Sequence, residues 1–251
     1  MIVLIFGLPG AGKTALAKEL CRRTNAIHLN ADDVRRGLSL DLGFSLEDRI
    51  EQARRMGEIS RLLSDQGKLV VVDFVNPTEE TRKAFGNCDC FVWVDRIQSG
   101  RFEDTNSMWE NPSEFDLKIG AGQTVEEEAI MVLSNCSIYD WTEPTTLMLG
   151  RYQPWHEGHQ ALKNEAHKRT NQVLIGVRNT HGTSEKDPLS YEEVVPYILR
   201  NNEQSKPLVM KLPNITNIVY GRDVGYKIEH VELSKEIQEI SATQKRKDMG
   251  I

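Results

Sequence analysis

The chain has 251 residues, of which 39% are hydrophobic and 27% are charged, so it can bury the cores of two domains and is not expected to be disordered. Its net charge of −6 argues against broad binding to nucleic acid, and no apolar run is long enough to cross a membrane. The four cysteines are scattered without the spacing of a zinc site, which predicts free thiols and a cytoplasmic protein.

A pattern typical of phosphate binding stands near the start of the chain, between an apolar run at residues 2–6 and a segment that places Leu16 and Leu20 on one helical face. Its residues are Gly7, Leu8, Pro9, Gly10, Ala11, Gly12, Lys13 and Thr14. Backbone N–H groups and the helix N-terminus would hold the phosphates of ATP, Lys13 would reach the outer phosphates, and Thr14 would bind Mg²⁺. A simple Gly/Pro-rich turn is the alternative, but every fixed position of the pattern matches.

Strands are then predicted at residues 26–30, 68–74 and 91–95, alternating with helices at 15–23, 45–65 and 125–133. This alternation is typical of a doubly wound parallel sheet. The segment 30–35 allows two interpretations: a helix cap followed by an acidic first turn, or acidic residues that orient a substrate hydroxyl or the water shell of Mg²⁺. The acidic residues 126–128 are interpreted as the solvated first turn of their helix.

Three stretches resemble adenylylsulfate (APS) kinase: residues 7–14, residues 29–38 with the sequence LNADDVRRGL, and residues 41–50 with the sequence DLGFSLEDRI. The resemblance extends over about residues 1–95. It implies a P-loop kinase domain at residues 1–139 that transfers the γ-phosphoryl group of ATP to the 3′-hydroxyl of APS. It also implies that Asp32 is the candidate catalytic base and that Arg35 and Arg49 contact the substrate anion. Phe44 would stack on the adenine ring of the substrate.

The chain departs from this family at several positions. The family pattern LDGDNVR reads LNADDVR here, so a carboxylate has become Asn30 and an amide has become Asp33. Asn76 stands where the family has a serine before proline, at a substrate-binding position. The lid, at residues 99–109, diverges most and leaves Arg101 as its obvious phosphate clamp. A related small-molecule acceptor therefore stays open.

Residues 140–145 resemble a linker, and the pattern restarts with a strand at 146–149, followed by predicted strands at 172–177 and 218–223. His156 and His159 stand at a predicted helix start, where they would face the same side. A surface pair or part of a zinc site are alternatives. Together with ISATQKR at residues 240–246, this segment resembles the HxGH nucleotidyltransferase superfamily, most closely archaeal-type nicotinamide-mononucleotide adenylyltransferases. The resemblance implies a Rossmann-like second domain at residues 146–251 and an ATP site made of Gly150, Arg151, His156, Gly158, His159, Ser241, Thr243 and Arg246.

The sequence thus predicts a bifunctional enzyme that uses Mg²⁺ and ATP, or another nucleoside triphosphate in the second domain. One domain would be an APS kinase, in which Lys13 and Asp32 are catalytic. The other would be a nucleotidyltransferase that uses His156 and His159 and releases pyrophosphate. Its partners would be small-molecule nucleotides rather than nucleic acid or membranes, and homo-oligomerisation is left open. ATP sulfurylase or nicotinamide-mononucleotide adenylyltransferase activity in the second domain, or a non-catalytic regulatory first domain, are the alternatives.

Overall fold

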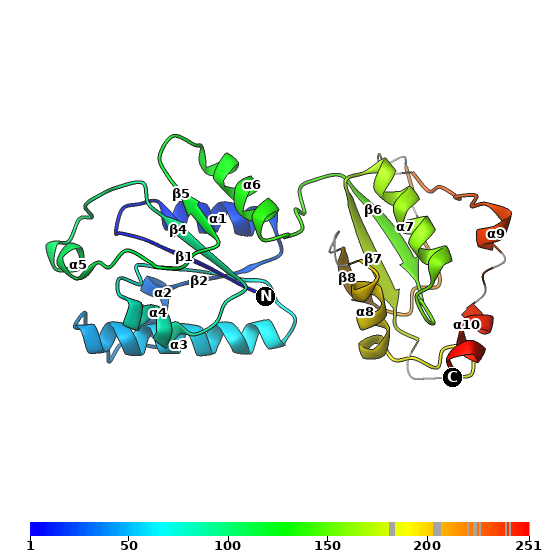
Figure 1. The fold of residues 1–251 in the computed structure, drawn as a ribbon, viewed down its shortest axis with the longest axis horizontal. Helices are drawn as coiled ribbons and strands as arrows, with labels where there is room; N and C mark the ends of the chain where they lie inside the picture. The colour runs from blue at the N-terminus through cyan, green and yellow to red at the C-terminus, as the bar shows by residue number, and fades with distance from the viewer. Residues whose placement is uncertain are drawn as a thin grey trace. The chain divides into compact units, whose positions relative to one another are not determined.

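The chain forms two compact units in the computed structural model, Met1–Thr142 and Glu143–Ile251 (Figure 1). The structure describes residues 1–180, 184–202, 207–219, 221–222, 225, 227–238, 240 and 242–250. Within these ranges no helix is both long enough and apolar enough to cross a membrane.

The first unit contains a five-stranded sheet in the order β2-β3-β1-β4-β5, and every pairing in it is parallel. The strands are β1 (Ile2–Phe6), β2 (Ile27–Asn30), β3 (Val70–Phe74), β4 (Cys90–Val94) and β5 (Leu117–Ile119). The parallel sheet predicted from the alternation of strands and helices is confirmed. All residues of the central strand β1 are buried, as expected for a strand covered on both faces.

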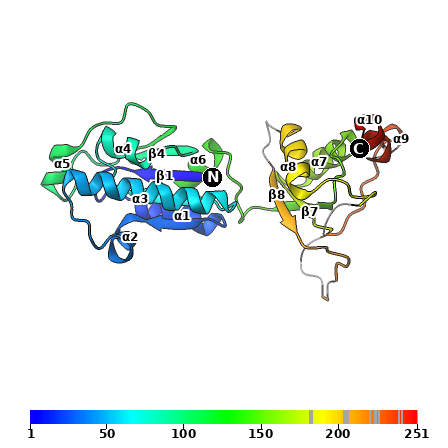
Figure 2. The same ribbon diagram turned by 90° about the horizontal axis from the view of Figure 1, so that it is seen from below.

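Helices cover both faces of this sheet (Figures 1 and 2). On one face, α1 (Lys13–Arg23) and α6 (Val125–Asn135) pack on Val3 and Ile5. On the other, α2 (Ala31–Gly37), α3 (Leu46–Asp65) and α4 (Glu79–Phe85) pack on Ile2 and Leu4. Successive residues of a strand point to opposite faces, which divides β1 between the two cores. The short helix α5 (Glu103–Met108) lies in the lid segment after β4.

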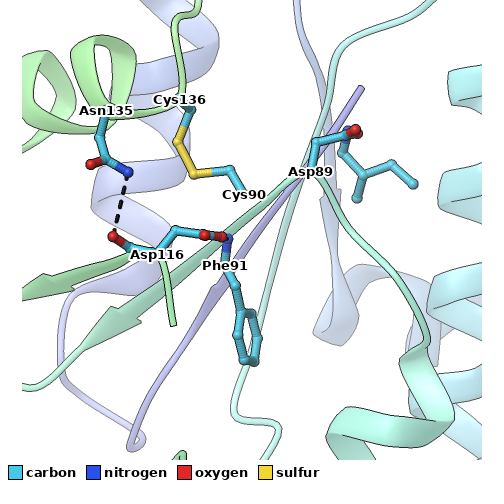
Figure 3. The surroundings of a disulfide bond; sticks show 7 residues. Asp89, Cys90, Phe91, Asp116, Asn135 and Cys136 are labelled. Carbon is cyan, nitrogen blue, oxygen red and sulfur yellow. Dashed lines mark hydrogen bonds between the residues drawn. A yellow bond between two sulfur atoms is a disulfide. The ribbon is translucent and has the colours of Figure 1, made fainter. Parts of the chain in front are cut away.

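The prediction of four free cysteines is wrong for two of them. Cys90, at the start of β4, and Cys136, directly after α6, form a disulfide (Figure 3). Cys21 and Cys88 are free thiols. The Cα atoms of Cys90 and Cys136 lie 6.0 Å apart, a usual separation for a disulfide, although the two residues are 46 positions apart in the chain. The sequence could not reveal this pair, because only the packing of α6 on the sheet brings the end of the helix to the start of β4.

The second unit contains a three-stranded parallel sheet in the order β6-β7-β8, formed by β6 (Thr145–Gly150), β7 (Gln172–Arg178) and β8 (Leu208–Leu212). Helices α7 (Glu157–Arg169) and α8 (Tyr191–Arg200) pack on it through Ala166, Val194 and Ile198. Two shorter helices follow, α9 (Lys235–Gln238) and α10 (Ala242–Met249).

The third strand of this sheet does not lie where the sequence predicted it. The described residues of the segment 218–223 are not in a strand, and Val219 is 90% exposed. The apolar residues of β8, which pair with β7 from Leu174 to Arg178, take that place. Both segments are short and apolar, and pattern alone does not decide which of two such runs finds a partner strand.

Candidate functional site

The glycine-rich loop connects the end of β1 to α1, so its backbone lies at the carboxyl end of the sheet. Gly7 and Gly12 both have positive φ angles, of 150° and 93°. A β-carbon at Gly7 would collide with the carbonyl oxygen of Val94, and one at Gly12 would collide with the guanidinium of Arg96. Both φ angles favour glycine, and at Gly7 the backbone carbonyl also leaves no room for a side chain.

Lys13 is almost completely buried, and its Nζ donates to the carbonyl oxygen of Leu8, 2.9 Å away, inside the loop. Burial lowers the pKa of Lys13 to about 8, against the opposing effect of the negative charges of Asp73 and Asp32. The ammonium group thus lacks a full salt bridge. An incoming phosphate would supply a stronger partner than the carbonyl.

Asp73, at the carboxyl end of β3, is a residue that the sequence analysis missed. Its carboxylate is 1% exposed and accepts a hydrogen bond from the Thr14 hydroxyl at 2.5 Å. The Asn30 amide donates to it at 3.0 and 3.1 Å, and His28 Nε2 lies 2.6 Å from it. Burial alone would raise the pKa of Asp73, but these hydrogen bonds hold it below its ordinary value. An acidic residue ending a strongly apolar strand is the signal that could have identified it.

A second missed contact lies behind the loop. Arg96, which follows β4, packs against Gly12 and forms an ion pair with Glu128 of α6. Glu128 is completely buried, so the interpretation of residues 126–128 as a solvated turn holds for Glu126 and Glu127 but is wrong for Glu128. The helix phase turns this carboxylate inward, because it lies on the same face as Val132.

The structure confirms the helix-cap interpretation of the segment 30–35, and its functional interpretation stays a prediction. The Asn30 side chain caps the helix by accepting from the N–H groups of Asp32 and Asp33, at 3.0 and 3.1 Å. The carboxylate of Asp32 is exposed beyond the same strand ends as the loop. Asp33 forms an ion pair with Arg36 on the surface of α2. An exposed carboxylate in the first helical turn is available to a substrate hydroxyl, and Asp32 is in that position.

Phe44 is 63% exposed and lies between two arginines. The guanidinium carbon of Arg35 lies 4.8 Å from the centre of its ring, and that of Arg49 lies 5.6 Å away. Both arginines are fixed by carbonyl oxygens, Arg35 by Gly43 at 2.6 Å and Arg49 by Phe44 itself at 3.0 Å. Burial lowers the pKa of Arg35, with Arg49 adding to the effect. A flat ring flanked by two cations suits a planar, anionic ligand.

Asn76 is completely buried and has a φ angle of 49°, in the left-handed region that asparagine tolerates. In the described part of the chain, neither atom of its side-chain amide has a hydrogen-bonding partner. A buried amide without a partner is costly, and a ligand group would satisfy it. Arg101, in the lid, is exposed, and its Nε lies 3.5 Å from the position of a β-carbon at Gly10.

In the second unit, His156 is the N-cap of α7 and His159 lies in its first turn, with the two rings stacked at 3.9 Å between centroids. His156 Nδ1 accepts from the N–H of Gly158 at 3.1 Å, and His159 Nδ1 accepts from the N–H of His156 at 3.3 Å. Burial lowers the pKa of His156, and burial together with His156 lowers the pKa of His159 to about 4. Both rings are therefore neutral at pH 7, with the hydrogen on Nε2.

The two signature segments of the second unit meet in space. Arg246 of α10 donates to the carbonyl oxygen of Gln153 at 2.8 Å and to the Thr243 hydroxyl at 3.3 Å. Lys245 forms an ion pair with Glu157 at 2.8 Å. Ser241 lies outside the described residues.

The glycines and the arginine of the first signature segment also have defined surroundings. A β-carbon at Gly158 would lie 2.9 Å from the His156 ring, and one at Gly150 would lie 2.8 Å from the Tyr152 ring. Arg151 pairs with Asp187 at 3.0 Å. The described residues contain no group of three or more His, Cys, Asp or Glu side chains that could hold a metal ion.

A cavity of about 150 Å³ lies between the end of β7, β8, the N-terminus of α8 and Gln153 in the loop after β6. Arg178, Lys211 and Tyr191 are among its lining residues. Arg178 Nε is buried and has no partner among the described residues, while Lys211 pairs with Glu192 at 3.0 Å. The cavity is thus lined by two cationic side chains, one of them paired with a carboxylate, and by an aromatic ring.

The first half of the chain is similar to proteins of one family. The family model for adenylylsulphate kinase matches residues 1–89. The chain is 42% identical over 156 residues to the adenylyl-sulfate kinase of Bacillus licheniformis, covering 51% of this chain and 79% of that protein. It is 30% identical over 157 residues to the adenylyl-sulfate kinase of Bacillus pumilus, covering 51% of this chain and 80% of that protein.

Two further proteins extend this comparison. The bifunctional enzyme CysN/CysC of Xylella fastidiosa is 43% identical over 82 residues, which cover 31% of this chain and only 13% of that enzyme. The structure of the Mycobacterium tuberculosis APS kinase CysC in complex with AMPPNP and APS is 27% identical, with a TM-score of 0.50 over 54% of this chain and 96% of that one. Through its N-terminal unit, with the phosphate-binding loop at the carboxyl end of a parallel sheet, the chain therefore belongs to the adenylylsulfate kinase family.

Proposed function

We propose that the N-terminal unit transfers the γ-phosphoryl group of ATP to the 3′-hydroxyl of adenylylsulfate, releasing ADP. The observation that carries this proposal is the ring of Phe44 held between Arg35 and Arg49, beyond the same sheet that bears the phosphate-binding loop. A planar base and an anionic sulfate ester are the two groups that such a site would bind. Family membership supports the same substrate.

Each candidate residue has a defined part in this reaction. Lys13 would leave the Leu8 carbonyl and bind the transferred phosphoryl group, and Arg101 would neutralise charge from the lid side. Asp32 would accept the proton of the attacking hydroxyl. The unpartnered amide of Asn76 would hydrogen-bond the acceptor. Thr14 would hold Mg²⁺, which would neutralise charge on the phosphates. The Thr14 hydroxyl donates its proton to Asp73, so the lone pairs of its oxygen stay available for the metal.

The test is ADP release from ATP in the presence of adenylylsulfate, with shikimate, gluconate and nicotinamide mononucleotide as control acceptors. We expect release with adenylylsulfate alone and none from Lys13→Ala. The variant Lys18→Ala, which removes an exposed lysine from the same helix, is the matched control and should keep full activity. Saturable binding of adenylylsulfate without ADP would instead identify a regulatory binding domain, and release with another acceptor would identify a different kinase.

For the C-terminal unit we propose nucleotidyl transfer with release of pyrophosphate. The observation that favours it is the contact of α10 with the loop before α7, which brings Arg246 and Thr243 beside the segment that carries both histidines. Neutral imidazoles with Nε2–H donors, a helix N-terminus and an arginine would stabilise the negative charge that builds at the α-phosphorus. The cavity lined by Arg178, Lys211 and Tyr191 would take the acceptor.

Pyrophosphate release tests this second proposal, with ATP or CTP offered against sulfate, nicotinamide mononucleotide and phosphorylated alcohols. His159→Ala should abolish pyrophosphate release while ADP release by the first unit continues, and Lys13→Ala should do the reverse. A requirement for sulfate would identify ATP sulfurylase activity, and one for nicotinamide mononucleotide an adenylyltransferase. Equal loss of both activities in either variant would contradict two separate sites.

A further inference from the structure

A carboxylate of the lid contacts one of the two arginines beside Phe44. Arg49 Nη2 donates to Asp104 Oδ2 at 3.1 Å and to the Thr105 hydroxyl at 3.0 Å. Asp104 and Thr105 belong to α5, whereas Arg49 belongs to α3, 55 and 56 positions away. Arg49 Nε donates to the carbonyl oxygen of Phe44 at 3.0 Å. One guanidinium therefore connects the lid to the residue that carries the exposed ring.

The two partners of this ion pair differ in exposure. The side chain of Arg49 is 11% exposed, whereas that of Asp104 is 59% exposed. The arginine is thus enclosed by the protein, and the carboxylate is largely in water. An ion pair with such an exposed partner contributes little to the stability of a fold. A ligand with a suitable anionic group can therefore displace Asp104 at small cost.

Asp104 occupies a hydrogen-bond donor that an anionic ligand needs. A guanidinium presents its N–H groups as a fixed fork, and a sulfate or phosphate group binds two neighbouring donors in parallel. The neighbouring pairs are Nε with Nη2 and Nη1 with Nη2, so both use Nη2. In Arg49 the two hydrogens of Nη2 point to Asp104 and Thr105. An anion that binds Arg49 in parallel must therefore replace a contact of the lid, and the contact with the like-charged Asp104 is the one that repels it.

We propose that Asp104 is an intramolecular competitor for the anionic group of the acceptor. It pairs with Arg49 while the site is empty, and the sulfate or phosphate group of the acceptor takes its place. The carboxylate thus lowers the affinity for anionic acceptors, and a ligand without an anion leaves the pair intact. This inference rests on the proposed function in that Phe44 and Arg49 bind the acceptor, but it does not require that adenylylsulfate is phosphorylated.

The variant Asp104→Asn tests this competition in the full-length protein, because it removes the charge at almost constant volume. Glu103→Gln is the matched control. Both acidic residues lie in the first turn of α5, so both substitutions change the helix N-terminus alike, whereas the contact with Arg49 is made by Asp104. Calorimetry measures the dissociation constants of adenylylsulfate, AMP and adenosine in the presence of Mg²⁺ and ADP, which fill the phosphate-binding loop.

We expect Asp104→Asn to bind adenylylsulfate and AMP about 3- to 10-fold more tightly, because no ion pair has to be broken and no like charge repels the ligand. The affinity for adenosine should stay within about twofold of the wild type, and Glu103→Gln should match the wild type for every ligand. In Arg49→Ala, which binds both anions more weakly, adding Asp104→Asn should change their affinity by less than about twofold, because the competition needs the guanidinium.

Unchanged binding of adenylylsulfate and AMP in Asp104→Asn would overturn the proposal. Weaker binding would also overturn it, because the carboxylate would then orient Arg49 for the acceptor. An equal gain in Glu103→Gln, or a gain that persists without Arg49, would assign the effect to the general charge of the lid. Absence of ADP release with adenylylsulfate would refute the proposed substrate, while the comparison of AMP with adenosine would still decide the role of Asp104.

Discussion

The ion pair between Arg96 and Glu128 gives the sharpest stability prediction. Glu128 is completely buried, whereas the side chain of Arg96 is 21% exposed. Removing Arg96 therefore leaves a fully buried charge without its partner, and removing the charge of Glu128 leaves a partly exposed one. Arg96→Met leaves a carboxylate without a partner in the core, which should cost about 3–5 kcal/mol of unfolding free energy. Glu128→Gln keeps an acceptor and leaves a guanidinium that can reach water, so it should cost only about 1–2 kcal/mol.

The double variant Arg96→Met/Glu128→Leu tests whether this asymmetry arises from the buried charge. It removes both charges and fills the space with apolar atoms, so it should be more stable than Arg96→Met alone. Because Arg96 also packs on Gly12, both variants without the arginine should bind ATP more weakly than Glu128→Gln.

Urea unfolding followed by circular dichroism measures these costs. The chain has two units, and the transition that MgATP shifts to higher urea is assigned to the first. An Arg96→Met variant within about 0.5 kcal/mol of the wild type would refute the reasoning, because the carboxylate would then not depend on its partner. A larger loss of unfolding free energy in Glu128→Gln than in Arg96→Met would refute it as well.

Three further predictions address the loop, the aromatic platform and the histidine pair. Gly12→Ala should cost about 1–3 kcal/mol of unfolding free energy and abolish nucleotide binding, because φ is 93° and the methyl group would meet Arg96. The control Gly37→Ala, at a position with open space around it, should bind ATP normally. Phe44→Ala should raise KM for adenylylsulfate about tenfold or more in steady-state assays and leave stability within about 0.5 kcal/mol, since the ring is 63% exposed; a large loss of stability would contradict this. The pKa of His159 should be near 4 by NMR, below its ordinary value of 6.5. Between these two pH values only the unfolded state binds the proton, so the second unit should lose up to about 3 kcal/mol of unfolding free energy as pH falls from 6.5 to 4. His159→Gln should abolish that slope, and a titration midpoint near 6.5 would show the reasoning to be wrong.

Local pattern was sufficient for the first unit because each of its signals is contained in a short stretch. The apolar run 2–6 became β1, the glycine-rich pattern became the connection to α1, and Ser45 caps α3 by accepting from the N–H of Asp48. Strand, loop and cap depend on backbone conformation and on neighbours within a few residues. The third strand of the second sheet was misplaced, because a short apolar run becomes a strand only if a partner is available.

The sequence by itself determined the chemistry of the loop: Lys13, Thr14 and the glycines between strand and helix are meaningful wherever that pattern occurs. Only the tertiary structure decided which distant residues support it. Asp73 reaches Thr14 across 59 positions, Arg96 reaches Glu128 across 32, and Cys90 reaches Cys136 across 46. These contacts arise from strand register and from the packing of α6 on the sheet, and such long-range proximity leaves no periodic signal in the order of residues.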